Sequence, residues 1–275
     1  MDVHWQLLPL LLAIGCIVGF LAGLLGVGGA MTMIPVLTLI FTHEGFSPEH
    51  VVHIAVATSL ATIMFTSLSS MRAHARRGAV LWGVAWGLAP GIVVGSLIGP
   101  QIVATMSSAL VAALFALFTG VSAVQMLANR EPRALRDLPG KPGLFGVGAT
   151  IGFISSMVGA GGAFLSVPFM VWCNVRIHNA VATSAAIGFP ISAAGTLGYM
   201  VAGLRQETLP PLSIGYVYVP AAAGIVVASM LTAPIGAQLA HRWPVLRLRR
   251  AFACLLVAIS GYMVWKAASF GGLAR

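Results

Sequence analysis

The chain of 275 residues contains one glycine-interrupted apolar stretch twice. The first copy reads G-F-L-A-G-L-L-G-V-G-G-A-M-T-M-I-P-V-L over 19–37, and the second reads G-F-I-S-S-M-V-G-A-G-G-A-F-L-S-V-P-F-M over 152–170. Within an apolar segment, glycines placed in this way predict a helix that stops and then resumes, because glycine readily adopts left-handed torsions. Matched breaks in the two halves of a membrane protein indicate the binding site of a carrier.

The composition places this repeat in a lipid bilayer. Hydrophobic residues make up 59% of the chain and charged residues only 8%, whereas a soluble domain carries roughly 25% charged residues. The net charge of +9 would suggest nucleic acid as a partner of a soluble chain. Here the basic residues lie in short loops between apolar segments, where they report orientation in the membrane. We therefore expect a multi-pass membrane protein with no nucleic-acid partner.

Ten apolar segments are candidates for membrane helices. A helix needs about 20 residues to span a bilayer, and three of the segments are too short to cross alone. Each of the short segments lies beside a glycine break. The ten segments are 5–25, 30–41, 51–70, 79–100, 108–128, 143–158, 163–174, 179–203, 211–240 and 251–270, and the short ones are 30–41, 143–158 and 163–174.

Two topologies fit these segments. In the first, each broken segment crosses the membrane once, so each half has four spans and the halves are parallel. In the second, each broken segment returns to its own side as a hairpin, three spans per half remain, and the halves are inverted. The second places almost all basic residues in the cytoplasm, and the positive-inside rule favours it. Those residues are Arg72, Arg76, Arg77, Arg130, Arg133, Arg136, Lys141, Arg176, Arg242, Arg247, Arg249 and Arg250.

Two further blocks recur in the same order. A-V-A-T-S occupies 55–59 and 180–184, and G-I-V-V-[GA]-S occupies 91–96 and 224–229. The predicted fold is an all-α integral membrane protein of two pseudo-symmetric, inverted repeats, each a glycine-broken helical hairpin followed by three spanning helices. The predicted division is a first repeat over 1–129, a cytoplasmic linker over 130–142 and a second repeat over 143–275.

The breaks themselves are the first candidate binding site. A resuming helix directs its free N–H groups and the positive end of its dipole at the break, which suits an anion. In the hairpin topology both breaks lie near mid-membrane and face one central cavity. The alternative is that the glycines only allow close helix packing. The candidate residues are Gly26, Gly28, Gly29, Ala30, Gly159, Gly161, Gly162 and Ala163.

Glycines at four-residue spacing form a separate ladder in the segment 79–100. Such spacing lets two helix backbones approach closely. We assign this ladder to helix packing or to the contact face of a homodimer. It consists of Gly83, Gly87, Gly91, Gly95 and Gly99.

Four hydroxyls and two histidines are matched between the halves. Thr58, Ser59, Thr183 and Ser184 would complete the anion site with hydroxyl donors, or instead bond to a backbone carbonyl one turn earlier. His53 and His178 fall near opposite membrane faces, as neutral interfacial imidazoles or as a proton-sensitive gate.

The residue types that are missing exclude several functions. All six acidic residues lie in loops or in the linker, so no span carries the carboxylate that coupled carriers commonly use. The chain has no Walker A pattern and no cluster of nucleophile, base or metal ligands at span depth. We therefore predict that the protein is not an enzyme and has neither a cofactor nor a metal site.

The residues above resemble the sulfite exporter TauE/SafE family. The resemblance rests on the doubled G-x-G-G-[AG]-x(4)-P block, the A-V-A-T-S block and the linker between the halves, and it covers nearly the whole chain. Family members often have a third glycine where this chain has Ala30 and Ala163. The resemblance implies a carrier of sulfur-containing oxyanions such as sulfite or organosulfonates.

We expect this carrier to lie in a bacterial inner membrane and to export its small anion. One negative charge that leaves a cell gains about 2.3 kcal/mol per 100 mV of inside-negative potential, so export requires no coupling ion. The alternatives are an anion channel and a membrane scaffold with no transport activity.

Overall fold

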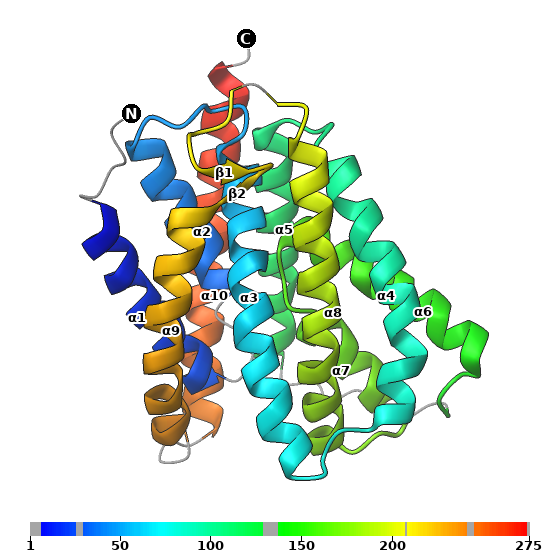
Figure 1. The fold of residues 1–275 in the computed structure, drawn as a ribbon. Helices are drawn as coiled ribbons and strands as arrows, with labels where there is room; N and C mark the ends of the chain where they lie inside the picture. The colour runs from blue at the N-terminus through cyan, green and yellow to red at the C-terminus, as the bar shows by residue number, and fades with distance from the viewer. Residues whose placement is uncertain (1–6, 26–29, 129–136, 207, 241–244, 274–275) are drawn as a thin grey trace.

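The computed structural model describes residues 7–25, 30–128, 137–206, 208–240 and 245–273. Within these ranges the chain forms ten helices and one two-stranded hairpin (Figure 1), so the predicted all-α membrane fold is confirmed. The elements are α1 (Leu7–Leu25), α2 (Ala30–His43), α3 (Val51–Arg76), α4 (Trp82–Val103), α5 (Ser108–Leu127), α6 (Lys141–Val158), α7 (Ala163–Trp172), α8 (Ile177–Gly203), β1 (Ser213–Ile214), β2 (Val217–Tyr218), α9 (Val219–Ala240) and α10 (Val245–Leu273).

Most of the helices suit a lipid environment. In the described part of the chain, five are long and apolar enough to span a membrane: α3, α4, α5, α8 and residues 250–271 of α10. Large apolar side chains such as Trp86, Leu117 and Trp265 point outward from these helices and are 63–70% exposed. Exposed apolar surface on this scale marks a face that meets a membrane.

Each glycine-broken segment turns back within the bundle. The start of α1 and the end of α2 lie at the end of the bundle that carries β1 and β2, as Figure 1 shows. The start of α6 and the end of α7 lie toward the opposite end. In chain order, α3, α4 and α5 follow the first pair of helices, and α8, α9 and α10 follow the second.

Helices from different halves pair along their lengths. α4 lies along α6 and α1 lies along α9, while α3 packs on α8 and α5 on α10. The close approach depends on glycine: a Cβ atom on Gly152 of α6 would lie 2.4 Å from the Ile92 carbonyl oxygen, and one on Gly19 of α1 would lie 2.4 Å from Ser229 Cα. Each G-I-V-V-[GA]-S block therefore packs against the broken hairpin of the other half.

The glycine ladder of α4 is used for packing within the chain. A Cβ atom on Gly91 would lie 2.0 Å from the Phe145 carbonyl oxygen, and one on Gly95 would lie 2.1 Å from the Ala149 carbonyl oxygen. Gly87 and Gly99 likewise face α6, and only Gly83 has open space around it. Four of the five glycines therefore serve packing within the chain, the first of the two roles considered for the ladder, and the homodimer stays a prediction.

The segment 211–240, expected to be one apolar helix, is divided. Residues 213–218 form the β1–β2 hairpin, with Ser213 opposite Tyr218, and the helix begins only at Val219. Two prolines, Pro210 and Pro211, precede the strands and cannot donate the hydrogen bonds of a helix interior. Gly215 makes the turn with a φ of +55°.

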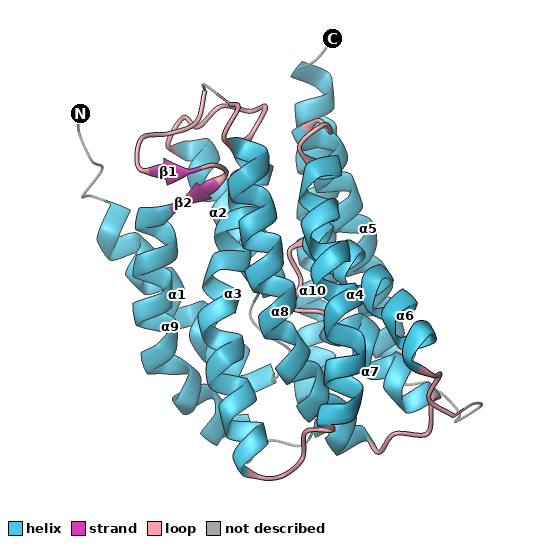
Figure 2. Ribbon diagram, turned by 45° about the vertical axis from the view of Figure 1, so that its right-hand side comes forward, coloured by secondary structure: helices cyan, strands magenta, loops and turns pink. Residues whose placement is uncertain are grey.

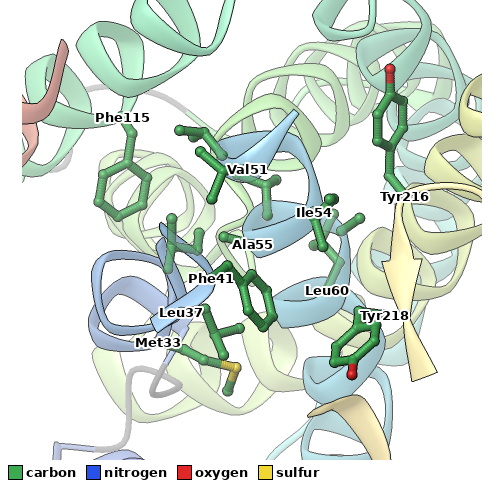
Figure 3. Packing of buried hydrophobic residues seen from close by; sticks show 14 of the residues in the cluster. Met33, Leu37, Phe41, Val51, Ile54, Ala55, Leu60, Phe115, Tyr216 and Tyr218 are labelled. Carbon is green, nitrogen blue, oxygen red and sulfur yellow. The ribbon is translucent and has the colours of Figure 1, made fainter. Parts of the chain in front are cut away.

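The hairpin is anchored by aromatic side chains that point into the bundle. Figure 3 shows Tyr218 beside Phe41 of α2 and Leu60 of α3. The Tyr216 ring meets His53 of α3 and Tyr199 of α8. Phe41 stacks on Phe46 with a centroid distance of 4.8 Å, and both rings meet Tyr218 edge-on. The hairpin thereby covers the ends of α2 and α3, as Figure 2 also shows.

Candidate functional site

The second glycine break is an interruption between two helices. α6 ends at Gly159, whose φ is +66°, and α7 begins after Gly162, whose φ is +80°. The N–H groups of Gly159 and Ala160 both donate to the Ser155 carbonyl oxygen and so close the end of α6. The left-handed torsions at both glycines explain why this position requires them.

The backbone amides that follow have no acceptor in the described part of the chain. Among the described residues, the N–H groups of Gly161, Gly162, Ala163 and Phe164 donate no hydrogen bond, and the first amide of α7 to do so is that of Leu165, to the Gly162 carbonyl oxygen at 3.1 Å. The first four N–H groups of a helix lack intrahelical partners and carry the positive end of its dipole. The break therefore presents four adjacent donors.

This break lies inside the bundle, against the middles of α3 and α8. A Cβ atom on Gly161 would lie 3.7 Å from Ile63 Cγ2, and one on Gly188 would lie 3.4 Å from the Gly161 carbonyl oxygen. Gly159 and Gly162 are buried, whereas Gly161 and Ala163 are only partly buried. The residues of the break are thus partly exposed and partly buried against α3 and α8.

The first break falls outside the described residues, which exclude Gly26, Gly28 and Gly29. Ala30 is the first residue of α2. The next residue, Met31, packs in one buried cluster with Ala160 and Phe164 of the second break and with apolar side chains of α5 and α10. The helix that resumes after the first break therefore begins close to the second break.

The two predicted threonines have a role that the sequence did not suggest. Thr58 Oγ1 accepts a hydrogen bond of 3.1 Å from the N–H of Tyr218, and Thr183 Oγ1 accepts one of 2.9 Å from the N–H of Leu81. Tyr218 directly precedes α9 and Leu81 directly precedes α4. Each threonine therefore satisfies an amide at the start of a helix in the other half.

The two serines beside them differ from each other. Ser184 Oγ accepts a hydrogen bond of 2.8 Å from Ser166 Oγ. Ser59 Oγ is fully buried and has no partner among the described residues. Ser155 Oγ is also fully buried without a described partner and lies 3.6 Å from the Cβ position of Gly162. The repeat pattern does not indicate Ser155, because the aligned residue of the first repeat is Ala22.

The matched histidines occupy unlike environments. His53 is buried at the start of α3, with Nε2 3.0 Å from the Val103 carbonyl oxygen, and its ring stacks on Tyr216 at 5.3 Å. His178 is exposed at the start of α8. The role of either as a proton-sensitive gate stays a prediction. In the described ranges, no three His, Cys, Asp or Glu side chains lie close enough together to hold a metal ion.

Comparison with known proteins assigns this chain to a family. The model of the sulfite exporter TauE/SafE family matches residues 11–263, a range that includes both broken hairpins. The chain belongs to the TauE/SafE family. No solved structure matches the chain.

Three relatives agree with the TauE/SafE assignment. A "probable membrane transporter protein" of Haemophilus influenzae is 30% identical, and the alignment covers 94% of this chain and 98% of the relative. Relatives with the same description from Methanocaldococcus jannaschii and Bacillus subtilis are 28% and 27% identical; the alignments cover 94% and 93% of this chain, and 96% and 99% of the relatives. As a TauE/SafE protein, this chain is a multi-pass membrane transporter.

Proposed function

We propose that this transporter is a carrier that exports a small sulfur-containing oxyanion, such as sulfite or an organosulfonate, across a bacterial inner membrane. The observation that carries the proposal is the run of four amides from Gly161 to Phe164, which donate to no described residue and lie next to α3 and α8. The family name supports a sulfur oxyanion, whereas the names of the relatives specify only a membrane transporter.

The chemistry of the break suits an anion better than a cation. Helix N-termini bind sulfate, phosphate and carboxylate groups through backbone N–H groups and the helix dipole. Enclosure in a low-dielectric interior strengthens this attraction. In the proposal Gly159, Gly161, Gly162 and Ala163 form one side of the site. The matched residues Gly26, Gly28, Gly29 and Ala30 form the other side, and Ser59 and Ser184 complete the site.

The threonines Thr58 and Thr183 act indirectly in this proposal. Because each bonds to the amide that precedes a helix of the other half, they hold the two halves in register around the breaks. Alternating access then comes from rocking one half against the other. Export is driven by the membrane potential, since a negative charge that leaves the cell gains about 2.3 kcal/mol per 100 mV.

The test is flux through purified protein in proteoliposomes, with sulfite, sulfate, thiosulfate, taurine and sulfoacetate as substrates. Gly161→Val fills the approach to the amides, while the nearest atom to the new Cβ lies at 3.7 Å and the backbone is not left-handed. We expect folded protein with little or no flux. Gly146→Val in α6 is the control, because that glycine has open space around it.

The outcome separates the alternatives. Undiminished flux in folded Gly161→Val would remove the break from the binding site. Flux that does not saturate with anion concentration would indicate a channel. If the wild type transports none of the anions, the remaining alternative is a membrane scaffold with no transport activity.

A further inference from the structure

Two buried hydroxyls beside the second break have no hydrogen-bond partner among the described residues. Ser155 in α6 and Ser59 in α3 are both 0% exposed, and neither Oγ atom bonds to any described residue. Buried polar groups in native proteins are nearly always paired, because burial without a partner costs free energy. A buried hydroxyl without a described partner, next to four amides that donate to no described residue, indicates that the hydroxyl bonds to a ligand when the site is occupied.

Ser155 is directed toward the start of α7. It lies in the last turn of α6, and its Oγ atom is 3.6 Å from the position that a Cβ atom on Gly162 would occupy. Its carbonyl oxygen already accepts the amides of Gly159 and Ala160. The hydroxyl is therefore the remaining hydrogen-bonding group of this residue, and it lies on the side of the free amides.

Ser59 approaches the same break from α3. Val56 Cγ1 lies 3.1 Å from the Cβ position of Gly159, and Ile63 Cγ2 lies 3.7 Å from that of Gly161. Residues three and four apart share one face of a helix, so Ser59, between Val56 and Ile63, lies on the α3 face that covers the break. The two serines thus border the break from two helices.

The residues related to Ser59 and Ser155 by the repeat do not offer unpaired hydroxyls. Ser184, the equivalent of Ser59, is already paired with Ser166. The residue that aligns with Ser166 is Met33, and the one that aligns with Ser155 is Ala22. The pairing of Ser166 with Ser184 has no counterpart around Ser59. Ser59 and Ser155 are two of the five buried hydroxyls without a described partner; the other three belong to Thr196, Ser213 and Tyr216.

We propose that Ser155 and Ser59 donate hydrogen bonds to the transported anion, so that the second break forms the side-chain part of an asymmetric site. This rests on the proposed function. An oxyanion with several acceptor oxygens accepts from the amides and from both hydroxyls at once. None of the helices α1 to α10 contains Asp or Glu, so the helices offer no carboxylate to repel the anion.

The experiment measures sulfite binding to the purified full chain by titration calorimetry, together with its melting temperature without ligand. Ser155→Ala and Ser59→Ala should each weaken sulfite binding roughly 10- to 100-fold, the loss expected for one hydrogen bond to a charged group. Without ligand, neither variant should melt below the wild type, because the removed hydroxyl has no partner. Ser155→Cys keeps the size of the side chain with a weaker donor and should bind with intermediate affinity.

The matched control is Ser192→Ala. Ser192 is equally buried, but its hydroxyl donates to the Gly188 carbonyl oxygen within α8, so sulfite affinity should stay within about twofold of the wild type. Wild-type affinity in both Ser155→Ala and Ser59→Ala would overturn the inference and leave the proposed function intact. Weaker binding together with a lower melting temperature would assign the serines a structural role and also overturn it. A wild type that binds no sulfur oxyanion would contradict the proposed function itself.

Discussion

Thr58 and Ser59 in α3 occupy the place in the first repeat that Thr183 and Ser184 in α8 occupy in the second. Both threonines accept the amide that precedes a helix of the other half, at 3.1 Å and 2.9 Å. The adjacent serines differ, because Ser184 is bonded to Ser166 and Ser59 is bonded to no described residue. The threonines therefore make the same hydrogen bond to a backbone amide in both repeats. The serines differ in their side-chain hydrogen bonds.

The glycines and histidines extend this comparison. Gly19 and Gly152 are equivalent and each allows a helix of the other half to approach. His53 and His178 are also equivalent in sequence, yet one is buried and the other exposed. A duplicated residue is thus a good guide to packing and a poor guide to the chemistry of a binding site.

The largest expected effect on stability comes from the glycines at which a helix of one half contacts a helix of the other half. Gly152→Leu and Gly19→Leu each place a side chain against the backbone of the partner helix, where even a Cβ atom would come within 2.4 Å. Both should lower stability by about 3 kcal/mol or more, the upper end of overpacking. The measurement is the yield of monodisperse protein and its melting temperature, with Gly146→Leu as the tolerated control. If one of the two positions accepts leucine, the copies do not share this role.

The next effect concerns the two threonines. Thr58→Val and Thr183→Val each remove the acceptor of a backbone amide and should destabilise the protein by about 1–3 kcal/mol, the cost of a buried unpaired donor. Thr150→Val is the control, because Thr150 is exposed and bonds only to the Gly146 carbonyl oxygen of its own helix. Denaturant titration should give similar losses for both threonines and almost none for the control. Unequal losses of stability would mean that only one of the two threonines stabilises the contact between the halves.

A smaller and one-sided effect is expected for the histidines. His53→Leu removes the hydrogen bond to the Val103 carbonyl oxygen and the stacking on Tyr216, at a cost of about 1 kcal/mol. His178→Leu should change stability by less than about 0.5 kcal/mol, as is usual at exposed positions. Melting temperatures of the two variants test this difference, and equal values would mean that the two sites are alike after all.

The smallest effect is on the pH dependence of stability, through the phenol of Tyr218, whose backbone N–H bonds to Thr58. Burial, with a contribution from Glu44, raises the pKa of Tyr218 above 10.0, whereas Leu81 in the equivalent contact does not titrate. The folded protein then keeps the tyrosine proton to higher pH than the unfolded chain, so stability falls as pH rises above 10. Tyr218→Phe should reduce this alkaline loss and leave stability near neutral pH almost unchanged. An identical alkaline loss in Tyr218→Phe would assign it to other groups.

Much of the fold was predictable, because the apolar segments are long and are separated by polar residues or glycines. The predicted segments 30–41 and 108–128 correspond to α2 at Ala30–His43 and α5 at Ser108–Leu127. The hairpin before α9 was not predicted, because its short strands are as apolar as the helix that follows. The division into repeats at residues 129 and 143, and the participation of the predicted site residues in binding, stay predictions.

The sequence by itself determined that the chain is a helical membrane protein interrupted by glycines at matched positions. Hydropathy and glycine torsions are local properties that need no knowledge of neighbours. Only the tertiary structure decided that each half packs its helices on the other, that both threonines accept amides across the halves, and that Ser59 and Ser155 are buried without a partner among the described residues. Hydrogen bonding and burial depend on which residues meet in space, and a repeat in the sequence does not specify which half each residue meets.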